Sequence, residues 1–360
     1  MSTFHEEKEA AYTTKLRAIL KELPPFCGLY FRAMESTTSI LTRYGYAVDL
    51  RNFFRFCLKS EDVSFAKGKQ ELKELTFNDL NAVQTLDIEL YLEHVTLYVE
   101  QEEKRTNKER AKARKLSALR SFFKYYYKQH LIENNVVALV ETPKIHEKAI
   151  VRLDVNEVAD LIDRAEDGSG LSKHQQRFHN ATKLRDVAIV TLFLGSGIRI
   201  SELVGIDLND IDFERDTFLI TRKGGNQDVL PFGTEVRNAL LLYYEERMKA
   251  EPLPGHEQAF FLSMQRRRIT VRAVENLVKK YANLAAPLKP ISPHKLRSTY
   301  GTMLYQESGD IYLVADVLGH KDVNTTRKHY AAMSEDRKRL AAKMIHLREE
   351  SSDLPPQEEH

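Results

Sequence analysis

Six side chains in the second half of the sequence belong to types that can act together on a phosphate ester. They are Arg199, Lys223, His294, Arg297, His320 and Tyr330. Two guanidiniums can bind both non-bridging oxygens of a phosphodiester and stabilise the charge of its pentavalent transition state. A tyrosine oxygen can attack the phosphorus, while a lysine protonates the departing 5′ oxygen and a histidine handles the proton of the nucleophile. The set predicts phosphoryl transfer through a covalent tyrosine intermediate. No cluster of Asp and Glu suited to Mg²⁺ accompanies these residues in the sequence, so we expect no metal.

Taken singly, these residues have ordinary structural explanations. Arg199 can pair with Glu202, three residues later in the chain. His294 and Arg297 follow Pro293 in the first turn of an expected helix, where a basic pair on the surface is common. The chemistry is therefore indicated by the combination and order of the residues, and by no single one of them.

Local elements must position these side chains. An apolar helix pair is expected over residues 183–203, with a break at the glycines of 195–197 just before Arg199. Two β-prone segments, 218–222 and 229–232, flank the turn Lys-Gly-Gly-Asn and predict a β-hairpin. The lysine of the set would therefore sit at or near the hairpin turn.

A strongly basic helix is expected at residues 102–130. Its apolar side repeats at intervals of three and four residues, in Leu116, Leu119, Phe123 and Tyr126. Its charged side is either a solvated helix surface or a face laid along a phosphate backbone, where each cation displaces a condensed counterion. The candidates for DNA contact on it are Lys108, Lys112, Lys115 and Arg120.

These patterns predict a mainly α-helical chain with a small β-sheet. Other helices are expected at 8–22, 36–58, 76–95, 154–165 and 270–281, and loops at 59–76 and 166–182. We divide the 360 residues into an N-terminal helical extension at 1–24, a helical domain at 25–142, a linker at 143–153, a second domain at 154–350, and a disordered tail at 351–360.

Composition limits the possible classes of protein. The 54 Lys and Arg residues against 52 Asp and Glu give a net charge of +2, which neither requires nor excludes a nucleic-acid partner. The longest apolar stretch, 187–198, is too short for a membrane span of about 20 residues, so no membrane partner is expected. Cys27 and Cys57 are the only cysteines, which excludes a disulfide scaffold and a four-cysteine zinc site. The first ten residues do not read as a secretory signal, so we expect a reduced, cytoplasmic protein.

Over about residues 25–347 the sequence resembles the tyrosine recombinase (phage integrase) family, especially its short Xer-like members. GSGIRISELVGI resembles the first arginine box, and TRKGGNQDVLPFG resembles the hairpin that carries the catalytic lysine. SPHKLRSTYGTML, followed by GDIYLVADVLGHKDVNTTRKHY, resembles the second box. The resemblance implies that Tyr330 is the nucleophile and that the other five residues of the set are catalytic.

The resemblance also implies an architecture and an assembly. An N-terminal helical, SAM-like core-binding domain and a mixed α+β catalytic domain would clamp duplex DNA. Four copies would assemble on paired recombination sites and exchange strands through a Holliday junction, without a cofactor and with no accessory factor identified. Three details depart from many members. Ser298 stands where many have His, Tyr330 lies ten rather than nine residues after His320, and the turn reads KGGN rather than KGN.

Two other functions remain open on the same scaffold: a type IB topoisomerase-like nicking-closing enzyme and a catalytically idle DNA-binding protein. The complete catalytic set argues against the idle protein, because binding alone needs no nucleophilic tyrosine. The segment 334–347 places Leu340, Met344 and Leu347 on one helical face. Such a helix could dock on a neighbouring subunit, as in recombinases, or fold back on its own chain.

Overall fold

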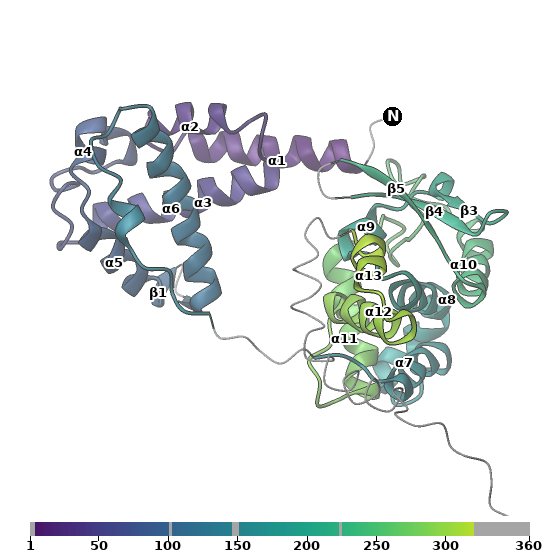
Figure 1. The fold of residues 1–360 in the computed structure, drawn as a ribbon. Helices are drawn as coiled ribbons and strands as arrows, with labels where there is room; N and C mark the ends of the chain where they lie inside the picture. Colours follow the sequence, from purple (N-terminus) through teal and green to yellow (C-terminus); the bar gives the residue numbers. More distant parts are fainter. Residues whose placement is uncertain (1–3, 101–102, 146–150, 223–224, 320–360) are drawn as a thin grey trace, which may run out of the picture. The chain divides into compact units, whose positions relative to one another are not determined.

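The computed structural model of the chain describes residues 4–100, 103–145, 151–222 and 225–319 (Figure 1). The chain divides into two compact units, Met1–Lys148 and Ala149–His360. The division falls inside the segment 143–153, which the sequence predicts as a linker. Helices dominate both units and the second contains a three-stranded sheet, so the predicted fold class is confirmed. No helix in the described ranges is long and apolar enough to cross a membrane.

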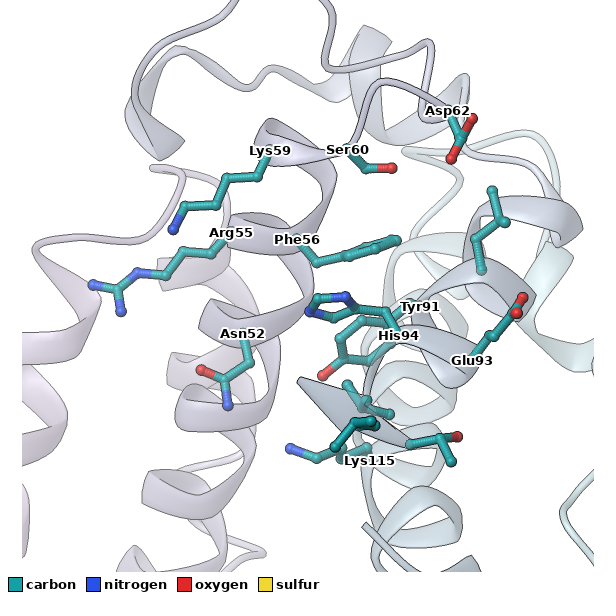
Figure 2. A pocket seen from close by; sticks show the side chains of 14 residues that line it. Asn52, Arg55, Phe56, Lys59, Ser60, Asp62, Tyr91, Glu93, His94 and Lys115 are labelled. Carbon is teal, nitrogen blue, oxygen red and sulfur yellow. The ribbon is translucent and has the colours of Figure 1, made fainter. Parts of the chain in front are cut away.

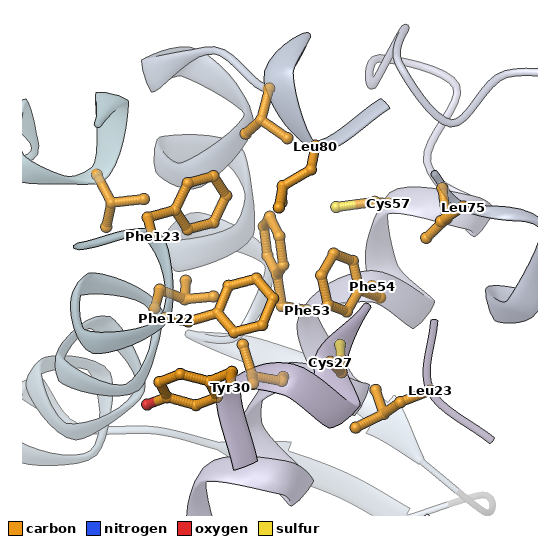
Figure 3. Packing of buried hydrophobic residues seen from close by; sticks show 14 of the residues in the cluster. Leu23, Cys27, Tyr30, Phe53, Phe54, Cys57, Leu75, Leu80, Phe122 and Phe123 are labelled. Carbon is orange, nitrogen blue, oxygen red and sulfur yellow. The ribbon is translucent and has the colours of Figure 1, made fainter. Parts of the chain in front are cut away.

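The first unit is built around an aromatic core. Its helices are α1 (Phe4–Leu20), α2 (Cys27–Ala33), α3 (Ile40–Lys59), α4 (Phe77–Asn81), α5 (Thr85–His94) and α6 (Glu109–Lys128), with short 3₁₀ turns at Leu72–Glu74 and Val136–Leu139. Rings from α2, α3 and α6 meet in the centre, including Tyr30, Phe54 and Phe122 (Figure 3). The helix of the predicted extension, α1, contributes Leu16 and Ile19 to this same core.

Both cysteines lie in that core. Cys27 and Cys57 are buried, free thiols. Burial raises the pKa of each thiol well above its ordinary value, because the thiolate would lose its hydration. They therefore act as small apolar core residues.

A β-hairpin replaces the start of the expected helix at 102–130. Strand β1 (Leu97–Glu100) pairs antiparallel with β2 (Glu103–Thr106), and α6 begins only at Glu109. Asn107 holds this boundary, because its side-chain amide donates to Val95 O at 2.8 Å and its backbone N–H donates to Thr96 O. Charged residues run through both β2 and the first turns of α6, so the sequence shows no change of pattern at this boundary.

The second unit is built around one long helix whose C-terminal half is apolar. It contains α7 (Val155–Asp167), α8 (Lys173–Ser196), α9 (Ile200–Gly205), α10 (Thr234–Arg247), α11 (Val271–Ala285), α12 (Pro293–Ser308) and α13 (Ile311–Val317). The C-terminal half of α8 is almost entirely buried and packs against α7, α10 and α12. The sheet has the order β3-β4-β5, with β3 (Ile211–Asp212), β4 (Thr217–Thr221) and β5 (Gln227–Pro231). The predicted hairpin is present as β4 and β5, with Thr221 opposite Gln227.

The prediction of a loop at 166–182 is mostly wrong. Only residues 168–172 separate α7 from α8, because Gly168 ends α7 in the left-handed conformation and Ser172 caps α8. The Ser172 hydroxyl accepts from Gln175 N, and the Gln175 side chain accepts from Ser172 N, which forms a capping box. The first turns of α8 are polar, so no apolar periodicity marks them. The helix expected at 76–95 is in fact two helices, α4 and α5.

Candidate active site

Arg199 follows a glycine turn that only glycine suits. Gly197 ends α8 with φ at +61°, in the left-handed region. A Cβ added there would collide with the ring of Tyr300 and lie 2.9 Å from Leu318 Cδ2. Glycine alone combines this backbone with such close packing. The chain therefore leaves α8 sharply, and Arg199 becomes the N-cap residue of α9.

A buried carboxylate orients Arg199. Glu202, only 3% exposed, accepts from the Arg199 backbone N–H at 2.7 Å and from its guanidinium Nη1 at 2.7 Å. The guanidinium Nη2 also donates to Gly319 O at 3.2 Å. The ion pair expected from the spacing is present, yet 32% of the Arg199 side chain stays exposed. The ion pair therefore orients the Arg199 guanidinium and leaves it accessible to a ligand.

Arg297 reaches the same place from α12. Arg297 is only 5% exposed, and its Nη1 donates to Gly197 O at 2.5 Å. Its Nη2 donates to Leu318 O, which lies directly after α13. Arg199 and Arg297, 98 positions apart in sequence, therefore converge on the carbonyl end of α13. Two guanidiniums side by side are suited to a phosphate with two non-bridging oxygens.

A third arginine, Arg222, joins this group and was missed in the sequence analysis. It follows β4, and its Nε and Nη2 donate to Asp228 Oδ2 at 3.0 and 2.8 Å. Its Nη2 also donates to Val317 O at 3.1 Å, and its Nη1 to Leu318 O at 3.4 Å. Its Nη1 lies 3.9 Å from Glu202 Oε2. Opposite charges on the two sides of the KGGN turn were the signal that could have indicated this pair.

Of the other four predicted catalytic residues, one, His294, lies among the residues that the structure describes. His294 lies in the first turn of α12, is exposed, and precedes Arg297 by three residues, so both project from one side of the helix. Lys223, His320 and Tyr330 lie outside the described residues, as do the predicted docking helix and tail. The structure therefore brings together the arginine pair and places His294 on the same helix as one of its members.

The predicted basic face of α6 is partly exposed. Lys108 is the exposed N-cap residue of α6, and Lys112 is half-buried with its Nζ 3.4 Å from the hydroxyl of Thr96. Arg120 instead anchors the chain after α6, because its Nη1 donates to the hydroxyl of Thr142 at 2.6 Å. Lys108 and Lys112 are therefore the better placed of the four candidates for a phosphate contact.

Lys115 lies inside the first unit and not on its exposed basic face. Its side chain is only 6% exposed, and its Nζ is 3.3 Å from Asp49 Oδ1. The same carboxylate, 1% exposed, accepts from Arg114 Nη2 at 2.8 Å. A buried cation needs such a partner. This position corrects the sequence-based placement of Lys115 on the charged surface, where spacing alone could not separate it from Lys112.

The first unit also holds a pocket of about 990 Å³ between α3, α5 and the start of β1 (Figure 2). The rings of Phe56 and His94 lie 4.8 Å apart in its wall. Burial lowers the pKa of His94, which favours the neutral ring. The charged groups around it have both signs, namely Arg55, Lys59, Lys115, Asp62 and Glu93. This mixture does not match the cationic set that the phosphate chemistry needs.

Comparisons with known proteins agree with the geometry of the second unit. The phage integrase family matches residues 151–337, more than half of the 360 residues. The tyrosine recombinase XerC of Caldanaerobacter subterraneus subsp. tengcongensis is 33% identical over 294 residues, covering 78% of this chain and 75% of the relative.

Solved structures share the fold. The XerH site-specific recombinase bound to palindromic difH substrate, in a post-cleavage complex, has a TM-score of 0.59 at 20% identity, covering 85% of this chain and 80% of that chain. A lambda integrase tetramer bound to a Holliday junction has a TM-score of 0.57 at 16% identity, covering 85% and 76%. With the family match and the extent of the XerC similarity, the chain belongs to the phage integrase family, as a Xer-like tyrosine recombinase that acts in site-specific DNA recombination.

Proposed function

We propose that this recombinase cuts and rejoins duplex DNA through a 3′-phosphotyrosyl intermediate, with Tyr330 as the nucleophile. The observation that carries the proposal is the convergence of Arg199 and Arg297 on the end of α13. When DNA binds, the two guanidiniums would give up their hydrogen bonds to backbone carbonyls and donate to the phosphate oxygens instead. There they would stabilise the extra charge of the transition state.

The remaining roles follow from the chemistry. Lys223 gives a proton to the 5′ oxygen as the P–O5′ bond breaks and the bond from phosphorus to Tyr330 forms. His294 and His320 hold the phosphate and handle the nucleophile's proton. The phosphotyrosine conserves the energy of the broken bond, so rejoining needs no high-energy cofactor.

We further propose how the protein meets its DNA. The first unit serves as a core-binding domain, with Lys108 and Lys112 among its phosphate contacts, and Arg120 positions the chain that leads to the second unit. Residues 154–350 act as the catalytic domain. The XerH protein bound to difH and the lambda integrase tetramer on a Holliday junction support paired DNA sites and four subunits as the working assembly. The helix expected in 334–347 would dock on a neighbouring subunit, and the reaction would take place in the cytoplasm.

The test begins with DNA selected from a random-sequence library by repeated binding to the full-length protein. The selected duplex is then prepared with single nicks at successive positions, so that cleavage next to a nick releases a short fragment and traps the covalent adduct. We expect an adduct on a denaturing gel with the wild type, and none with Tyr330→Phe although binding persists.

Three results would count against the proposal. An adduct with the Phe variant would show that another residue is the nucleophile. No wild-type adduct on the selected duplex would favour an idle DNA-binding protein. Relaxation of a supercoiled plasmid carrying two selected sites, with no exchange between them, would favour the topoisomerase-like function.

A further inference from the structure

Arg222 is a charged residue beside the candidate site, and the proposed mechanism leaves it without a role. Its side chain is 11% exposed, although it stands at the base of a hairpin turn, where a cation is normally solvated. A buried guanidinium needs partners for its charge and its donors. The partners it has, on three different elements, indicate what it does.

The first contact ties Arg222 to its own hairpin. Asp228, on β5, receives two hydrogen bonds from the guanidinium at 3.0 and 2.8 Å. The backbone N–H of Arg222 donates to Asn226 O at 2.7 Å, and Gly225 N–H donates to Arg222 O at 3.1 Å. Side chain and backbone together close the base of the KGGN turn, in which Lys223 follows Arg222 directly.

The second contact ties the hairpin to the end of α13. Arg222 donates to Val317 O and Leu318 O, and Leu318 O is also an acceptor for Arg297. Gly319, with φ at +60°, lies so close that an added Cβ would be 2.8 Å from the Arg222 Cζ. The hairpin is therefore held against the same helix end that holds the arginine pair.

The third contact is electrostatic. Glu202, the carboxylate that orients Arg199, also lies 3.9 Å from Arg222 Nη1. A lysine could not make these contacts together, because a single ammonium lacks the planar fork that reaches Asp228, two carbonyls and Glu202 at once.

We propose that Arg222 is a positioning residue that locks the β4–β5 hairpin to the arginine pair, so that Lys223 delivers its proton to the departing 5′ oxygen. This inference rests on the proposed function. In the step concerned, the Tyr330 hydroxyl gives its proton to a histidine of the site as its oxygen bonds to phosphorus, the P–O5′ bond breaks, and the Lys223 ammonium protonates the leaving oxygen. Arg222 touches none of the reacting atoms and acts through Lys223.

The test separates positioning from general stability by changing the leaving group. The selected duplex is made with the ordinary oxygen, and with sulfur in place of the 5′ bridging oxygen at the mapped cleavage site. A sulfur leaving group needs no proton, so its departure does not depend on a well-placed Lys223. Single-turnover rates of adduct formation are measured with both substrates for the wild type, Arg222→Gln, Asp228→Asn and Lys223→Ala.

We expect Arg222→Gln to slow cleavage of the oxygen substrate about 10- to 100-fold, the scale of a misplaced catalytic group. The sulfur substrate should restore most of the rate, as it should for Lys223→Ala. The double variant Arg222→Gln/Lys223→Ala should be no slower than Lys223→Ala alone, because both changes act on one step. The matched control is Arg215→Gln, whose side chain is 84% exposed in the turn between β3 and β4, and which should match the wild type on both substrates.

The outcomes distinguish the inference from the proposed function. A wild type that forms no adduct overturns the proposed function and this inference with it. An active wild type with a normal Arg222→Gln, or with a defect that sulfur does not relieve, overturns the inference alone. Weaker DNA binding by Arg222→Gln without sulfur rescue would assign Arg222 to a phosphate contact. If Arg222→Gln fails to fold, Asp228→Asn decides in the same way, because the Asp228 side chain is 42% exposed and its change leaves less buried charge unpaired.

Discussion

Replacing Glu202 by Gln should lower both the stability of the second unit and the rate of DNA cleavage. The carboxylate accepts from the Arg199 backbone and guanidinium at 2.7 Å each, one bond on each oxygen. A glutamine has the same shape but only one oxygen, so one bond is lost and an amide NH₂ then faces a donor. A hydrogen bond to a charged group contributes about 1.5–3 kcal/mol, and here the buried negative charge facing Arg222 is lost as well. We therefore expect a loss at the upper end, about 3 kcal/mol.

For a unit of this size, that loss lowers the melting temperature by about 6–12 °C. The chain has no tryptophan, so unfolding is followed by far-ultraviolet circular dichroism. Cleavage of the selected duplex should fall as well, because Arg199 loses the group that aims it. Glu214→Gln, an exposed position between β3 and β4, is the matched control and should behave as the wild type. A Glu202→Gln variant with wild-type melting and wild-type cleavage would refute the argument that this carboxylate orients the site.

Three further predictions follow from single features. Gly197→Ala should lower the melting temperature, because a left-handed backbone costs a non-glycine residue about 1–2 kcal/mol and the new methyl group has no room. The double variant Lys108→Gln/Lys112→Gln should reduce the slope of log K against log salt for DNA by up to about 0.9 per lost contact, whereas Lys115→Gln should lower stability and leave the slope unchanged. Deleting 336–360 should abolish strand exchange and the cooperative filling of paired sites in a gel-shift titration, while single-site binding persists. Undiminished cooperativity with full recombination would exclude docking of that segment on a neighbour.

Secondary-structure elements with a clear local sequence pattern were predictable from the sequence. The hairpin was predictable because β-prone segments flank a glycine-rich turn, and both strands are present as β4 and β5. The start of α8 was not, since its first turns are polar and a capping box, rather than an apolar stripe, sets the boundary. The β1–β2 hairpin was missed for a related reason, because its second strand continues into the charge run that precedes α6.

For the candidate site, too, the sequence indicated the residue types, whereas the contacts of those residues came from the tertiary structure. Arg199 and Arg297 were predictable from the chemistry that two guanidiniums can do, and their pairing with Glu202 and the end of α13 supplies the geometry. Lys115 looked like any other cation of α6 until its neighbour Asp49, 66 positions away in the chain, was known. Sequence spacing reports which face of a helix a residue occupies, but not what the rest of the fold places against that face.

Arg222 is a second example of a residue whose contacts sequence spacing does not report. In the sequence it is one more cation beside a turn, and a solvated turn arginine is the ordinary expectation. In the fold, its partners lie on β5, on α9 and at the end of α13, and no local window contains all three. Glu202 on α9 also holds Arg199, and Leu318 O at the end of α13 also accepts from Arg297, so the same network that stabilises the unit sets the relative position of the hairpin and the arginine pair. A substitution in that network therefore changes stability and chemistry together, and the leaving-group comparison is needed to separate the two.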